Sequence, residues 1–208
     1  MTLNLMVRVQ SLVVSKDIPV NNDENLVARC RRGDEEAFRM IFERYAGSIN
    51  GFIYSMHGER DLAEELTQET FVRAYQKIGT IRDASKLSTW LFGIAKNVAR
   101  EALSVRLSKA RTHVTIGDSA VSEMSDNNPS PSEGLLNKEL HRVMLEALNQ
   151  LDDDKRQVFT LKAFHHLRYD DIAEITGFSL AKVKSDLHRA RGEMQRFISA
   201  YTEQYDEV

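Results

Sequence analysis

Basic side chains gather on one side of a stretch near the C-terminal end of the chain. Apolar residues recur there at alternating spacings of four and three, starting with Val183 and Leu187, which predicts the buried side of a helix. Lysine and arginine can neutralise DNA phosphates, and side chains on a helix can reach base edges. The residues predicted to bind DNA on its other side are Lys182, Lys184, Ser185, His188, Arg189 and Arg191.

A short amphipathic segment precedes this basic stretch. Ile172 and Ile175 give it an apolar side, and Gly177 permits the positive φ that ends a helix. Ser179 is a suitable N-cap for the helix that follows. The pattern predicts a helix-turn-helix whose second helix enters the major groove. A helical hairpin with a solvated basic face is the alternative for this stretch alone.

A second basic helix is predicted from Ser88 to about Leu103. Its polar side carries Lys96, Asn97 and Arg100, and the segment over 96–111 contains five basic residues and one acidic residue. Trp90 starts an apolar stripe and lacks aromatic neighbours for a base-stacking platform, so we expect it in the core.

An acidic helix is predicted from Asp61 to about Ile78. Glu64, Glu65, Gln68 and Glu69 lie on its outer side, where they form a solvated or partner-binding face. Its inner side is predicted to place six residues toward a core: Leu62, Leu66, Phe71, Ala74, Tyr75 and Ile78.

The sequence contains no motif typical of an enzyme or a metal site. Glu-x-x-His, His-Glu-x-x-His, the phosphate-binding loop and the Gly-x-Ser-x-Gly elbow are all absent. His165 and His166 are adjacent, so on a helix they diverge by about 100°, and we expect both at the surface or at a helix end. We therefore predict a protein without catalytic activity, cofactor or metal.

Composition predicts an all-α protein. The 208 residues include three prolines and carry a net charge of −3, and alternation of β-branched residues is scarce beyond the first twenty. One cysteine, Cys30, fits a reducing cytoplasm. No apolar run reaches the roughly 18 residues that span a bilayer, so we expect no membrane insertion.

Composition also predicts two small helical domains. We expect an N-terminal tail over 1–22, a first domain over 23–111, a flexible acidic linker over 112–134 and a second domain over 135–208. Residues 112–137 contain no lysine or arginine, and Pro129 and Pro131 prevent a continuous helix there. The linker is predicted to act as a tether.

Residues 22–201 resemble a bacterial RNA polymerase sigma factor of the extracytoplasmic-function group. The segments that carry the resemblance are 62–75, 88–101 and 151–191, in this order. The resemblance implies that 62–75 binds core RNA polymerase, that 88–101 contacts the minus-ten promoter element, and that 151–191 reads the minus-thirty-five element. The residues that it assigns to polymerase binding are Asp61, Glu64, Glu65, Gln68, Glu69 and Arg73.

The resemblance also implies that an anti-sigma factor controls the protein. It further implies that the loop over 79–86 forms a pocket for a base that flips out of the melted strand. Asp152, Asp186 and Gly192 depart from the usual pattern, and the last two reduce the basic character of the recognition helix. The alternatives are a free-standing dimeric helix-turn-helix regulator, which leaves the face of 62–75 unexplained, and a helical enzyme. Co-purification with core polymerase separates a sigma factor from a free-standing regulator.

Overall fold

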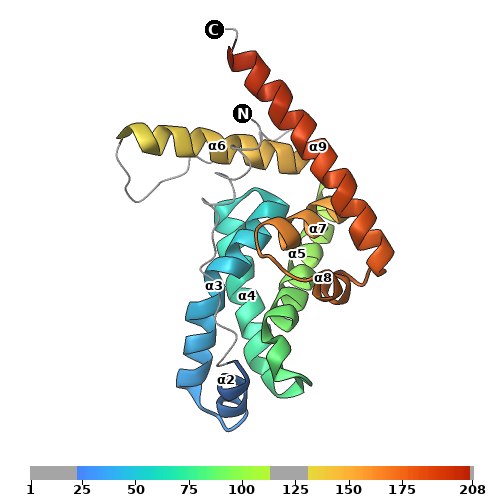
Figure 1. Cartoon of the computed structure of the whole chain (residues 1–208). Coiled ribbons are helices and arrows are strands. Elements are labelled where there is room, and N and C mark those ends of the chain that lie inside the picture. Colours follow the sequence, from blue (N-terminus) through green and yellow to red (C-terminus); the bar gives the residue numbers. More distant parts are fainter. Residues whose placement is uncertain (1–22, 113–130, 207–208) are drawn as a thin grey trace.

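The computed structural model describes residues 23–112 and 131–206, with side chains for 23–106 and 141–201. Every regular element in these ranges is helical (Figure 1). None of the described helices is both long and apolar enough to cross a membrane. The elements are α2 (Asp23–Cys30), α3 (Glu35–His57), α4 (Arg60–Lys77), η2 (Ile78–Thr80), η3 (Ala84–Lys86), α5 (Leu87–Thr112), α6 (Pro131–Gln150), α7 (Asp153–Ala163), α8 (Tyr169–Thr176) and α9 (Leu180–Asp206).

The N-terminal domain packs α2, α4 and α5 around α3. Asp34 caps α3, because its side chain accepts a hydrogen bond from the Ala37 N–H, and Gly58 ends the helix at φ 73°. Asp23, the first residue of α2, is buried, where Arg44 donates to one carboxylate oxygen at 2.6 Å and the Tyr45 hydroxyl donates to the other. A carboxylate thus ties the start of α2 to the middle of α3.

The helix predicted from Ser88 starts one residue earlier, at Leu87. Asp83 caps the short η3, its side chain accepting from the Ser85 N–H, and α5 follows directly from Leu87, so Ser88 lies inside the helix. Trp90 is half-buried against the core, as expected, while Leu91 and Phe92 beside it are fully buried.

The C-terminal domain contains the predicted helix-turn-helix. Asp152 caps α7 by accepting from the Lys155 N–H, so this departure from the sigma-factor pattern suits the start of a helix. Gly177 ends α8 at φ 77°, and Ser179 accepts from the Lys182 N–H to cap α9. Val183, Leu187, Ala190 and Met194 are buried, which confirms the apolar stripe.

The two domains pack against each other. α7 contacts α3, and α8 contacts α5 (Figure 1). The buried apolar side chains of both domains form one continuous core. The Ser55 hydroxyl of α3 donates to the Thr160 hydroxyl of α7 at 3.2 Å, and both side chains are buried.

The predicted flexible linker falls mainly on residues 113–130, outside the described ranges, as does the predicted tail over 1–22. Helix occupies both ends of the predicted linker, since α5 extends to Thr112 and α6 starts at Pro131. Proline is compatible with a first helical turn, because the first N–H groups of a helix have no partner inside it.

Candidate nucleic-acid and polymerase interfaces

The exposed side of α9 presents five of the six residues predicted to bind DNA there. Lys184, Ser185, His188, Arg189 and Arg191 are all exposed. Arg189 forms no ion pair within the described residues. The two carboxylates nearest in sequence are engaged elsewhere: Asp186 pairs with Lys182 at 2.6 Å, and Glu193 pairs with Lys155 at 2.8 Å. The Arg189 guanidinium is therefore available to a DNA strand.

Lys182, the sixth residue, is held against the protein. Its ammonium lies 2.6 Å from Asp186 and 3.1 Å from Asp154 of α7, and it lies over the ring of Phe178. The hydrogen bonds from Asp186 and then Asp154 raise the pKa of Lys182, so it stays protonated. Asp186 is itself buried against Lys182, so its carboxylate does not lie on the exposed side of α9.

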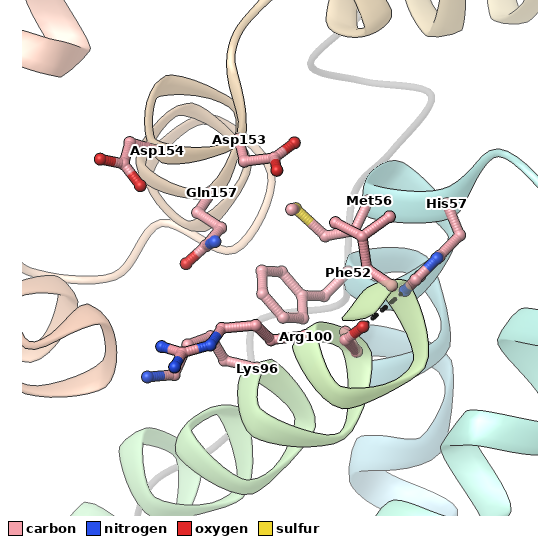
Figure 2. Close-up of a pocket in the computed structure, with 10 residues that line it drawn as sticks. Phe52, Met56, His57, Lys96, Arg100, Asp153, Asp154 and Gln157 are labelled. Atoms are coloured by element: carbon pink, nitrogen blue, oxygen red, sulfur yellow. Dashed lines mark hydrogen bonds between the residues drawn. The ribbon is translucent and has the colours of Figure 1, made fainter. Parts of the chain in front are cut away.

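The second basic face lies on α5. Asn97 and Arg100 are exposed and Lys96 is half-buried. Burial, and secondarily the charge of Arg100, lowers the pKa of Lys96. Figure 2 shows Lys96 and Arg100 extending side by side from α5, opposite Asp153, Asp154 and Gln157 of α7. These residues line a cavity of about 140 Å³ between the two domains.

The outer side of α4, here called the α4 face, carries the residues assigned to polymerase binding. Asp61, Glu64, Glu65 and Gln68 are exposed. Glu69 and Arg73 pair with each other at 2.7 Å, and Arg73 also reaches Glu101 of α5 at 2.8 Å. Arg73 therefore joins two helices as well as lying on the face.

An apolar groove continues the α4 face toward the C-terminal end of the helix. It is lined by Phe38, Phe42, Gln68, Phe71, Val72, Tyr75 and Gln76. Val72 and Tyr75 are each 51% exposed, and Phe42 is 40% exposed. The prediction that Tyr75 faces the core was wrong: Phe38 packs edge-on to Tyr75 with ring centroids 5.0 Å apart, and this contact holds the phenol at the surface.

Both histidines lie just past the C-terminal end of α7, which confirms the prediction that they are surface or helix-end residues. His166 is exposed, in the left-handed region at φ 53°. The ring nitrogens of His165 are buried, and its ring contacts Phe52 and Phe92 of the other domain. The sequence pattern could not reveal this, because the covering rings come from α3 and α5.

One arginine connects the ends of two helices from different domains. Arg156 of α7 donates to Leu148 O at 3.0 Å and Leu151 O at 3.0 Å near the end of α6, and to Met56 O at 3.1 Å in the last turn of α3. Carbonyl groups at helix C-termini lack partners inside the helix and carry partial negative charge. The sequence alone gave no signal for this role.

Within the described residues no group of three histidine, cysteine or acidic side chains is placed to hold a metal ion. The geometry defines a two-domain helical protein with two basic helices, a helix-turn-helix and an acidic, partly apolar face.

Comparison with known proteins identifies the family. Residues 41–106 match the model of sigma-70 region 2, and residues 141–194 match that of sigma-70 region 4. The RNA polymerase sigma-H factor of Pseudomonas aeruginosa is 31% identical, the match covering 81% of this chain and 90% of that protein. The sigma-E factor of Haemophilus influenzae is 30% identical over 81% and 91% of the two chains. The chain belongs to the extracytoplasmic-function group of the sigma-70 family.

Solved structures share the fold. The sigma factor RpoE of Bartonella quintana, solved with the anti-sigma factor NepR, superimposes with a TM-score of 0.64 at 24% identity, covering 78% of this chain and 96% of that one. CnrH, solved with the cytosolic domain of CnrY, gives a TM-score of 0.63 at 22% identity, covering 86% and 97%.

Proposed function

We propose that this protein is an alternative sigma factor that binds core RNA polymerase, directs it to specific promoters and helps to melt them. The observation that carries the proposal is the presence of sigma-70 regions 2 and 4, in that order, each presenting an exposed basic helix. A free-standing regulator would need the helix-turn-helix but not the α4 face. The protein acts without catalytic activity of its own, in the cytoplasm.

We assign each proposed contact to one surface of the protein. The α4 face, extended by the apolar groove, binds polymerase. Lys96, Asn97 and Arg100 contact the minus-ten element. The exposed side of α9 reads the minus-thirty-five element. Lys182 supports this helix through its ion pairs with Asp154 and Asp186.

We also propose control by an anti-sigma factor. The Bartonella quintana relative was solved with such a partner, and the fold is shared.

Run-off transcription tests the function. Core RNA polymerase should initiate from a subset of a genomic promoter library when this protein is added, and not from those promoters without it. The proposal would be contradicted if this protein supports no specific transcript while the same core polymerase initiates transcription with a control sigma factor.

The α9 assignment makes a separate prediction. Arg189 lies nine residues after the first residue of α9, whereas base edges are met mainly from the N-terminal part of a recognition helix. We therefore expect Arg189→Ala to weaken binding to all promoter variants alike, and to reduce the slope of log affinity against log salt by about one, as loss of one phosphate contact does.

Binding of Arg189→Ala to single-base promoter variants at two salt concentrations checks this expectation. Arg196→Ala, which removes another exposed arginine farther along α9, serves as the control and should bind like the parent. A loss of about 1–3 kcal/mol confined to one base position would assign Arg189 to base readout instead. Unchanged binding would remove Arg189 from the DNA interface.

A further inference from the structure

His165 occupies the interface between the two domains. It lies between α7 and α8, and its ring centroid is 4.8 Å from that of Phe92 and 6.3 Å from that of Phe52. Neither ring nitrogen has a hydrogen-bond partner within the described residues, and both are buried. An imidazole in this position can be accommodated neutral, since a charge there would lack both water and a counter-ion.

The same interface faces the proposed minus-ten residues. The first turn of α7 places Asp153 and Asp154 across the interdomain cavity from Lys96 and Arg100 (Figure 2). The cavity of about 140 Å³ is too small for a DNA strand. Its carboxylates would also repel phosphates, because like charges at short range oppose each other. In this arrangement DNA cannot reach the full basic face of α5.

We propose that His165 is a proton-sensitive latch between the two domains, whose protonation separates α7 and α8 from α3 and α5 and uncovers Lys96 and Arg100. The part concerning DNA rests on the proposed function, whereas the latch itself does not. The partner is the other domain of the same chain, which the imidazole contacts through two phenylalanine rings.

The pKa of His165 determines how pH changes the ratio of closed to open protein. Burial, with a smaller contribution from neighbouring His166, lowers the pKa of His165 to about 4, against an ordinary value of 6.5. Above pH 6.5 the ring is neutral in both arrangements and the closed one keeps its full stability. Between pH 6.5 and about 4 the open arrangement binds the proton, so the ratio of closed to open falls about tenfold per pH unit.

Other titratable groups lie on the elements around the interface. They include His57 on α3, Lys96 and Arg100 on α5, Asp153, Asp154, Arg156 and Lys162 on α7, and Asp170, Asp171 and Glu174 on α8. Glu174 pairs with Lys86 of η3 across the interface at 2.7 Å. His57 is the main competitor, because burial lowers its pKa too, although its Nε2 lies 3.1 Å from Ala99 O inside its own domain. The experiment must therefore separate the two histidines.

Thiol labelling measures opening even when the open state is rare. In the full chain with Cys30→Ser, Ser55→Cys places a thiol at the buried contact with Thr160. A pyridyl disulfide reagent reacts at acid pH and labels this thiol only when the interface opens. The reported quantity is the labelling rate with His165 divided by that with His165→Leu, so the pH dependence of the thiol chemistry cancels.

We expect this ratio to rise about tenfold for each pH unit below 6.5. A thiol at Ala74→Cys, buried within the N-terminal domain, reports unfolding of that domain and should give a flat ratio. His166→Asn should open like the parent, since asparagine tolerates its positive φ. The latch would be overturned if the ratio at Ser55→Cys does not change with pH. It would also be overturned if His57→Gln, rather than His165→Leu, removes the pH dependence of labelling.

A variant with a permanent charge tests the consequence at neutral pH. His165→Arg should label faster at Ser55→Cys than His165→Leu, and should bind a single-stranded minus-ten oligonucleotide more tightly, because arginine cannot lose its proton. Lys96→Ala with Arg100→Ala in the His165→Arg background should abolish that gain. If His165→Arg labels faster but does not bind the oligonucleotide more tightly, His165 controls the contact between the domains, but that contact does not block DNA from Lys96 and Arg100. Equal labelling would refute the latch.

Discussion

Reversing the charge at Glu65 and Glu69 together is expected to reduce the affinity for core RNA polymerase on the order of 100-fold, because like charges brought together across an interface cost several kcal/mol. Glu65 is exposed on the α4 face and Glu69 lies one turn farther along, paired with Arg73. The fold should survive, since neither side chain is buried. Glu65→Lys with Glu69→Lys is compared with the parent in a core-polymerase binding assay, with circular dichroism confirming helicity.

A matched control separates position from net charge. Glu36 and Glu43 on α3 are exposed, and both pair with Arg39. Glu36→Lys with Glu43→Lys changes the net charge by the same amount and also breaks helix-surface ion pairs, yet it should leave polymerase binding close to that of the parent. Unchanged binding with Glu65 and Glu69 reversed would show that polymerase meets another face.

Replacing Arg156 by methionine is expected to lower the free energy of unfolding by about 3 kcal/mol. Its side chain is 13% exposed, and its guanidinium hydrogen-bonds carbonyl groups of α6 and α3. Methionine fills similar space but leaves these carbonyl groups without their charged donor. Arg156→Lys should be intermediate, because one ammonium cannot reproduce the fork of a guanidinium.

Urea unfolding measures this loss. Arg168→Met is the control, since the Arg168 side chain is 81% exposed and lies 3.8 Å from Asp170, and such surface changes usually stay within about 0.5 kcal/mol. Equal stability of Arg156→Met and the parent would mean that the carbonyl groups find other donors, and that Arg156 does not hold the domains together.

Local patterns predicted the helices well. The periodicity from Val183 to Met194 identified the buried side of α9 because a helix repeats every 3.6 residues, and that repeat is visible in one segment. Gly177 and Ser179 marked helix ends because each acts on backbone groups only a few residues away. The exposure of Lys184, Ser185 and Arg189 followed from the same periodicity.

Features that depend on distant segments were missed. Tyr75 has a core-like position on its own helix, but Phe38 of α3 holds it at the surface beside an apolar groove. Lys182 was predicted to bind DNA from its place on α9, but its ion pair with Asp154 of another helix could not be predicted. The burial of Asp23 depends on Arg44 and Tyr45, which lie on the next helix.

The amino-acid sequence by itself determined the helices, the two basic faces and the resemblance to a sigma factor, because each of these depends on the types and spacing of residues that are near each other in the sequence. The tertiary structure alone decided how the two domains meet. That contact places His165 between two phenylalanine rings and Arg156 across two helix ends. Its physical basis is burial between segments about a hundred residues apart, as in the bonds from Arg156 to Met56 and from Ser55 to Thr160, and no periodicity within one segment can encode such pairs.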